Sequence, residues 1–215
     1  MTKNIMTCYM IRHGKTCGNQ QKRYIGKATD EPLSREGRQE LFLLKKKYPK
    51  ELAALFDRDI TIFSSPLKRA QESAKLLFPI AGLVLEPGLS EMDFGIFEGK
   101  NYQELSGDPR YQAWISSFCR DKIPEGESME EFKGRSFQAF SSCLLGRRDP
   151  ALLTQDPMIF LCHGGTIMSV LSHLTGEDYY SFQVANADGY RIEIGVNEDE
   201  LTAISYHRLL DRISS

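Results

Sequence analysis

The sequence predicts an α/β fold with three layers, α/β/α, a mostly parallel central sheet, an antiparallel hairpin at one edge and a small helical cap insertion. Short apolar runs alternate with helical patterns, which is typical of a parallel sheet covered on both faces. Two strand-like runs joined by a polar turn follow near the C-terminal end. An irregular, aromatic-rich stretch at about 94–127 interrupts the alternation, so we expect one domain over residues 1–215 with a cap insertion there.

The chain opens with a predicted strand and helix. The run IMTCYMI (5–11) is apolar and contains β-branched and aromatic residues, which indicates a buried strand. Residues 35–48 have a helical pattern. Ser34 is the expected N-cap, because its hydroxyl can accept from the first unpaired backbone N–H groups. Glu36 suits the positive end of the helix dipole.

A second strand and helix follow. The segment DITIFSSP (59–66) predicts a strand that ends in small and polar residues. The helix after it covers LKRAQESAKLLF, with Ser65 as its expected N-cap and Pro66 as its first residue. Proline suits that position because its missing N–H would have no partner at a helix start.

The second half of the chain continues the alternation. Ser128 and Glu131 fit the pattern of a capping box, which predicts the start of a helix with apolar residues at helical spacing. The segment PMIFLCHGG (157–165) predicts a third buried strand, and a helix over 166–176 ends at a glycine. The segment 189–207 predicts the edge hairpin.

Composition narrows the class of protein. The 215 residues are 41% apolar and 26% charged, with a net charge of −2. This balance is ordinary for a globular protein and argues against nucleic acid or an anionic membrane as a partner. No apolar run reaches the roughly 18 residues of a membrane span. The five cysteines contain no C-x-x-C pair, so we expect reduced thiols, no metal and a cytoplasmic location.

Cationic side chains and glycines stand at or just beyond the carboxyl ends of the three predicted strands, where open α/β sheets bind ligands. Guanidinium groups match phosphate oxygens, helix N-termini add N–H donors, and glycine lets the backbone approach an anion. This pattern predicts a phosphoryl pocket that needs no metal. The residues are Arg12-His13-Gly14, Arg69 and His163-Gly164.

Five segments in a fixed order carry a family resemblance: RHGKT (12–16), YIGKATDEPLSREGRQE (24–40), SSPLKRAQESA (64–74), LSEMDFGIFEGK (89–100) and CHGG (162–165). Together they resemble the histidine phosphatases, also called the phosphoglycerate mutase-like superfamily, over nearly the whole chain. The branch they resemble most contains α-ribazole phosphatases and broad-specificity phosphatases. A single R-H-G would be weak evidence, whereas the full set in order is specific.

The resemblance implies a phosphohistidine mechanism. His13 would be the nucleophile, kept neutral by nearby positive charges that depress its pKa. Arg12, Arg69 and His163 would hold the phosphoryl oxygens. Glu91 would protonate the leaving oxygen and later deprotonate water, with Asp93 and Glu98 as alternatives close in sequence. The expected phosphate or substrate contacts are Asn19, Thr16, Gly164, Tyr24 and Gly26, although Thr16 could equally cap a turn.

The implied function is a metal-independent phosphomonoesterase that acts on a small phosphate ester without a cofactor. One candidate substrate is α-ribazole 5'-phosphate, because Tyr111 or Trp114 could stack on its aromatic base. Sugar phosphates and phosphoglycerate remain alternatives.

Two other classes of protein fit the sequence less well. A phosphoglycerate mutase would have an arginine-histidine-tyrosine stretch after the acid, whereas Glu91 is followed by MDFGIFEGK. A non-catalytic phospho-ligand-binding protein would be expected to lack the nucleophile or the acid, and both are present. The edge hairpin could pair between two copies, so a homodimer is the expected form of any self-association.

Overall fold

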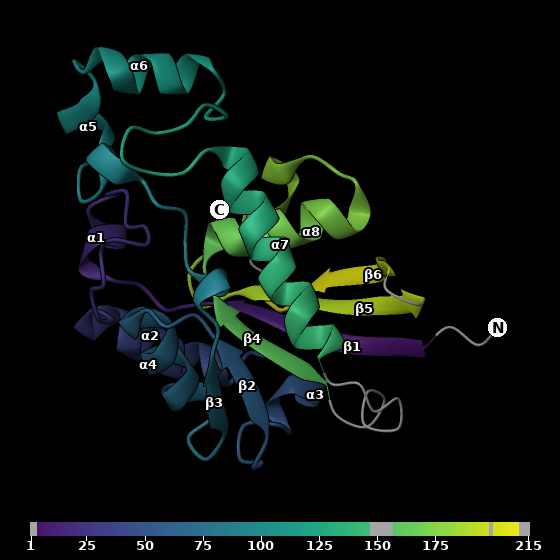
Figure 1. Cartoon of the computed structure of the whole chain (residues 1–215). Coiled ribbons are helices and arrows are strands. Elements are labelled where there is room, and N and C mark those ends of the chain that lie inside the picture. The colour runs from purple at the N-terminus through teal and green to yellow at the C-terminus, as the bar shows by residue number, and fades with distance from the viewer. Residues whose placement is uncertain (1–3, 147–156, 198–199, 211–215) are drawn as a thin grey trace.

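A six-stranded sheet forms the centre of the computed structural model, which describes residues 4–146, 157–197 and 200–210 (Figure 1). The spatial order of the strands is β3-β2-β4-β1-β5-β6. Their bounds are β1 Asn4–Arg12, β2 Thr61–Ser64, β3 Gly82–Leu85, β4 Met158–Cys162, β5 Gly189–Asn197 and β6 Glu200–Arg208.

The sheet is mostly parallel, as predicted. Strand β4 pairs in parallel with β1 on one side and with β2 on the other, and β3 extends the parallel part. Strand β5 pairs antiparallel with β1, and β6 pairs antiparallel with β5, which confirms the edge hairpin. The polar turn predicted between these two strands falls at 198–199, outside the described residues. Strand β3 was not predicted, because this short edge strand is mostly exposed and has no buried apolar run.

Helices cover both faces of the sheet. The α-helices are α1 Cys17–Gln20, α2 Arg35–Lys45, α3 Lys50–Ala53, α4 Lys68–Leu77, α5 Tyr102–Leu105, α6 Pro109–Ser116, α7 Met129–Leu145 and α8 Gly164–Thr175. The 3₁₀ helices are η1 Pro87–Leu89, η2 Gly95–Phe97 and η3 Tyr179–Phe182. Figure 1 shows α7 and α8 on one side of the sheet and α2 and α4 on the other.

Side-chain alternation along the strands gives each helix layer its own core. Met10 of β1 packs in a cluster with residues of α7 and α8, whereas its neighbour Ile11 packs with residues of α2, α3 and α4. Successive side chains of a strand point to opposite faces, so one apolar run supplies both cores. The predicted three layers are therefore confirmed.

Two of the three predicted N-cap residues are confirmed and one is corrected. The Ser34 side chain accepts from Gly37 N, and Ser128 forms a capping box with Glu131. Helix α4 instead begins at Lys68, with Leu67 at the N-cap and no side-chain cap. Ser65 lies outside this helix, and its hydroxyl accepts from Leu67 N at 3.3 Å while also bonding a histidine described below.

The segment 94–127 contains η2, α5 and α6 and supplies most of a third apolar cluster. Its aromatic rings pack mainly edge to face, for example Phe97 against Tyr111 with centroids 5.3 Å apart. Figure 1 shows α5 and α6 at the end of the molecule toward which β1 and β4 run. Among the described residues, no helix is long and apolar enough to cross a membrane.

Candidate active site

Two histidines meet where β1 and β4 leave the sheet. Arg12 at the end of β1 pairs with Cys162 at the end of β4, and His13 N donates to Cys162 O at 3.1 Å. The ring centroids of His13 and His163 lie 5.1 Å apart, with the ring planes at 61°. The parallel register thus brings the two predicted histidines, distant in sequence, into one small site.

The backbone fixes the tautomer of the His13 ring. Its Nδ1 lies 2.7 Å from Gly14 O, and since a carbonyl oxygen only accepts, Nδ1 carries the hydrogen. The lone pair of the neutral ring is therefore on Nε2. Burial, followed by the charges of Arg69 and Arg12, holds the pKa of His13 well below its usual range.

His163 is fully buried at the N-cap of α8. Its Nε2 is 2.8 Å from Ser65 Oγ. Leu67 N donates to Ser65 Oγ, and His163 Nε2 is the other partner of this hydroxyl in the described structure, so the hydroxyl hydrogen is directed at Nε2. The hydrogen of the neutral ring is then on Nδ1, which is buried without a hydrogen-bond partner within the described structure. Burial first, and then Arg69, keep the pKa of His163 well below its usual range.

Two arginines flank the histidines, Arg69 fully buried and Arg12 half-buried, and backbone carbonyls accept hydrogen bonds from both. Arg12 Nη1 donates to Val184 O at 2.7 Å. Arg69 donates from Nη1 to Thr29 O at 2.7 Å and from Nη2 to Gly26 O at 2.9 Å. The Nε atoms of both arginines are buried and have no partner among the described residues. Burial lowers the pKa of both groups, yet a guanidinium stays protonated at neutral pH.

Glu91 is fixed at the start of α8. Its Oε1 accepts from Met92 N at 3.0 Å, and its Oε2 accepts from Gly165 N at 3.1 Å. A Cβ at Gly165 would lie 2.3 Å from Glu91 Oε1, so a glycine is needed for this contact. At the predicted Gly164 a Cβ would be 3.3 Å from the Arg12 guanidinium carbon, a tight but milder approach.

The two alternative acids have other partners. Asp93 Oδ1 accepts from Gly95 N at 3.0 Å, within its own turn. Glu98 accepts from Gly26 N at 3.0 Å and from the Thr29 hydroxyl, and so ties down the loop whose carbonyls hold Arg69. A Cβ at Gly26 would lie 2.1 Å from Met92 O, so close packing of the backbone explains that glycine. These positions favour Glu91 as the acid.

Thr16 and Asn19 form the cap of the short helix after His13. Thr16 Oγ1 accepts from Asn19 N at 3.1 Å, so this threonine is the N-cap of α1. Asn19 Oδ1 accepts from Thr16 N at 3.3 Å and from Asn186 Nδ2 at 3.1 Å, which leaves the Asn19 amide nitrogen as the end that can meet an anion. Asn186 also donates to His13 O at 3.2 Å.

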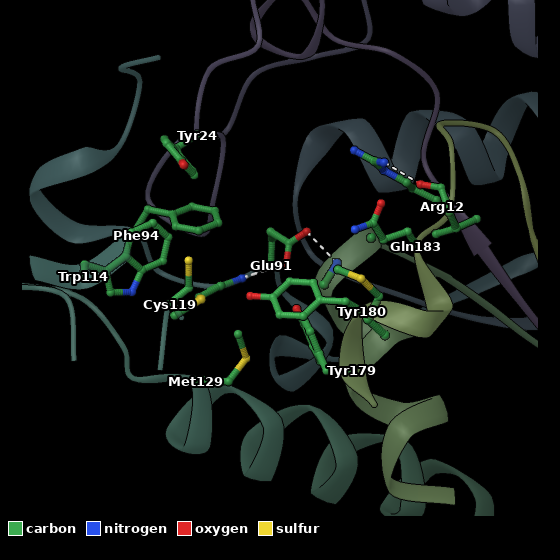
Figure 2. Close-up of a pocket in the computed structure, with 15 residues that line it drawn as sticks. Arg12, Tyr24, Glu91, Phe94, Trp114, Cys119, Met129, Tyr179, Tyr180 and Gln183 are labelled. Atoms are coloured by element: carbon green, nitrogen blue, oxygen red, sulfur yellow. Dashed lines mark hydrogen bonds between the residues drawn. The ribbon is translucent and has the colours of Figure 1, made fainter. Parts of the chain in front are cut away.

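A cavity of about 420 Å³ lies beside this cluster (Figure 2). Tyr24, Phe94 and Trp114 form its end toward α6, Arg12 lies at the opposite end, and Glu91 lies between them. His13, His163 and Arg69 are not among the residues found to line it. Arg12 and Gly164, their chain neighbours, connect the cavity to the histidines.

Of the two aromatic residues expected to stack on substrate, one reaches the cavity. Trp114 lines it, whereas Tyr111 is 1% exposed, packs inside the third apolar cluster and is not a lining residue. The Tyr111 hydroxyl is instead 2.7 Å from the Tyr24 hydroxyl. The structure therefore places Tyr111 behind Tyr24, as a support for a lining residue.

Several residues of the site escaped sequence reasoning. Tyr179 and Tyr180 line the cavity from η3. Two adjacent tyrosines were the sequence feature that could have indicated them. Gly165 could have been noticed beside Gly164. The roles of Ser65 and Asn186 had no local signal, because each depends on a contact with a distant segment.

The described parts of the chain contain no group of three or more His, Cys, Asp or Glu side chains placed to hold a metal ion. The titratable groups of the site are instead positioned by backbone N–H and carbonyl groups and by Ser65.

The sequence matches known proteins over most of its length. A sequence model of the histidine phosphatase superfamily (branch 1) matches residues 8–206. A probable phosphoglycerate mutase GpmB of Yersinia pestis is 30% identical over 177 residues, which cover 79% of this chain and 78% of that protein.

Solved structures give the same fold. A putative alpha-ribazole-5'-P phosphatase from Escherichia coli superposes with a TM-score of 0.75 at 21% identity, covering 97% of this chain and 99% of that one. A mutant of TTHB049 from Thermus thermophilus has a TM-score of 0.63 at 30% identity, covering 87% and 92%.

Proposed function

Because the chain is an enzyme of the histidine phosphatase superfamily, branch 1, we propose that it is a metal-independent phosphomonoesterase that works through a phosphohistidine at His13. One observation carries the proposal. Arg12 Nε, Arg69 Nε and His163 Nδ1 are all buried and have no partner in the described structure. Buried donors normally have acceptors, and the oxygens of a phosphoryl group next to His13 would supply them.

In the first half of the reaction, His13 Nε2 attacks phosphorus. The new N–P bond forms as the bond from phosphorus to the leaving oxygen breaks, and Glu91 gives its proton to that oxygen. The arginines and His163 donate to the oxygens of the transferring group, where charge is highest in the transition state. The Asn19 amide adds a donor at the same end.

In the second half, water attacks the phosphohistidine. Glu91 takes one proton from this water, the N–P bond breaks, and its electrons return to His13 Nε2. Inorganic phosphate leaves, and Glu91 is again protonated for the next cycle. The low pKa of His13 helps here, because a neutral ring is regenerated without a further proton transfer.

The apolar cavity supports α-ribazole 5'-phosphate as the substrate. Most of its wall is aromatic or sulfur-containing, which suits a flat base better than a polyhydroxylated sugar. The protein from Escherichia coli with the same fold is described as a putative alpha-ribazole-5'-P phosphatase.

The alternative is phosphoglycerate, after the name of the Yersinia relatives. Phosphoglycerate would bring a carboxylate beside the phosphate. Arg12 is the one cationic side chain among the described lining residues, and it stands at the phosphoryl end. The wall thus favours a phosphatase with an uncharged leaving group over a mutase for phosphoglycerate.

Phosphate release tests the proposal. We expect turnover of p-nitrophenyl phosphate in excess EDTA, loss of turnover in His13→Asn, and higher kcat/KM for α-ribazole 5'-phosphate than for glucose 6-phosphate or 3-phosphoglycerate. Activity that EDTA abolishes, or full activity of His13→Asn, would contradict the mechanism. Equal kcat/KM across the three metabolites would contradict the substrate.

A further inference from the structure

Trp114 has a polar atom that the fold does not satisfy. The side chain is 5% exposed, it lines the cavity, and its Nε1 is buried with no hydrogen-bond partner in the described structure. Figure 2 shows it beside Phe94 and Tyr24, at the end of the cavity farthest from Arg12. A buried indole N–H normally donates to an acceptor. An unsatisfied donor in a residue that lines a cavity therefore indicates an acceptor atom on a ligand.

The neighbouring aromatic rings are a poor substitute for that acceptor. Tyr24 meets Trp114 edge to face with centroids 5.8 Å apart, and Phe94 does so at 6.4 Å. An N–H directed at a ring face is a much weaker interaction than one directed at oxygen or nitrogen. The Tyr24 hydroxyl is engaged with Tyr111. The surrounding protein therefore leaves the indole donor for a ligand.

The rest of this end of the cavity is uncharged. The charged lining residues within the described chain are Arg12, which lies at the phosphoryl end, and Glu91, which lies between the two ends. Phe94, Met129 and Tyr179 contribute apolar surface around the space that Trp114 borders. A charged leaving group would lose its hydration here without gaining an oppositely charged partner. An uncharged flat ring would instead pack against the apolar side chains.

We propose that Trp114 is a specificity-determining residue whose indole N–H donates to an acceptor atom on an uncharged, flat heteroaromatic leaving group, at the end of that group away from the phosphate. The inference rests on the proposed phosphatase function and adds the chemistry of the leaving group to it. The ligand class is a phosphate ester of a neutral heteroaromatic alcohol or nucleoside with one ring nitrogen or carbonyl oxygen directed at Trp114.

The test uses pairs of esters that differ by one ring atom. 1-Naphthyl phosphate is compared with a set of quinolinyl phosphates in which one ring CH is replaced by nitrogen at successive positions. The enzymes are the wild type, Trp114→Phe, which keeps an aromatic ring and loses the N–H, and Ile115→Ala as a control. Ile115 follows Trp114 in α6, is 39% exposed and is not a lining residue.

We expect the wild type to prefer the quinolinyl ester with the best-placed nitrogen, in kcat/KM. That preference over naphthyl phosphate should fall about 3- to 10-fold in Trp114→Phe, which corresponds to one neutral hydrogen bond, and should not change in Ile115→Ala. Comparing the two enzymes on the same pair of esters cancels the different reactivity of the leaving groups.

The outcomes separate this inference from the function beneath it. An unchanged preference in Trp114→Phe, with turnover intact, overturns the role of Trp114 and leaves the phosphatase standing. Turnover of p-nitrophenyl phosphate but of none of the bicyclic esters overturns the leaving-group class. No turnover of any ester by the wild type overturns the proposed function and this inference with it.

A second measurement does not depend on any variant. The sequence contains one tryptophan, so the ¹⁵N-labelled wild type gives a single indole N–H signal. We expect its proton to shift downfield on addition of inorganic phosphate with the preferred quinolinol, but not with phosphate and 1-naphthol. The same shift with both alcohols, or no shift with either, overturns the hydrogen bond.

Discussion

Because two imidazoles are buried, we predict that the free energy of unfolding decreases as the pH falls below about 6.5. In the unfolded chain, His13 and His163 have ordinary pKa values near 6.5. In the folded chain, burial and the two arginines hold both pKa values well below that. Below pH 6.5 the unfolded chain therefore binds protons that the folded chain does not. Stability is fully present above the unfolded pKa and is lost as the pH falls toward the folded pKa.

The size of the effect follows from the unfolded pKa. Between pH 8 and pH 5.5, one histidine that stays neutral in the fold lowers the free energy of unfolding by at most about 1.4 kcal/mol, and two lower it by about 2.8 kcal/mol. Total stabilities are about 5–15 kcal/mol, so the change is large enough to measure. Carboxylates with a lowered pKa, such as Glu127, lose their contribution only below about pH 4.5, outside this window.

Urea denaturation at pH 8, 7, 6 and 5.5, followed by the fluorescence of the single tryptophan, measures the effect. The proteins are the wild type, His13→Asn and His207→Asn; His207 lies exposed on β6. We expect His13→Asn to lose up to about 1.4 kcal/mol less than the wild type between pH 8 and 5.5, and His207→Asn to match the wild type. Equal losses in all three proteins would refute a depressed pKa at His13.

Two substitutions test how the site is positioned. Ser65→Ala leaves the buried Nε2 of His163 without a partner, so we expect the free energy of unfolding to fall by about 1–3 kcal/mol and kcat/KM to fall with it; unchanged values in urea denaturation and steady-state kinetics would contradict this role. Gly165→Ala places a Cβ 2.3 Å from Glu91 Oε1 and should displace this carboxyl group. Hydrolysis of alkyl phosphates, which need a protonated leaving oxygen, should then slow by about 10²-fold or more. Hydrolysis of p-nitrophenyl phosphate should slow less. Gly134→Ala is the matched control, because its Cβ would meet nothing within 4 Å, and a similar rate loss there would refute the steric argument.

The parts of the fold that the sequence predicts well are those with local signals. β1, β2 and β4 are buried apolar runs, and Ser34 and Ser128 form side-chain caps that can be recognised within a few residues. The short exposed strand β3 lacks such a signal. Ser65 looks like a helix cap in isolation but bonds His163, so a tertiary contact overrides the local pattern.

In the candidate site, too, some residues have a signal in the sequence and others depend on tertiary packing. The family resemblance predicts the histidines, the arginines and Glu91, whereas the position of polar residues at strand ends accounts only for Arg12, His13 and His163. Neither predicts which cap residue reaches the cavity. Tyr111 and Trp114 are three residues apart on one face of α6, yet packing buries the first behind Tyr24 and leaves the second at the wall. Such a choice depends on how the cap packs, which no spacing rule contains.

Trapping the phosphoenzyme tests the central claim most directly. The wild type is mixed with p-nitrophenyl phosphate, quenched in base during turnover, digested and analysed by mass spectrometry. The mechanism predicts a phosphoryl group on His13 that disappears after acid treatment and is absent from His13→Asn. Rapid turnover with the phosphoryl group on another residue, or full activity of His13→Asn, would contradict it.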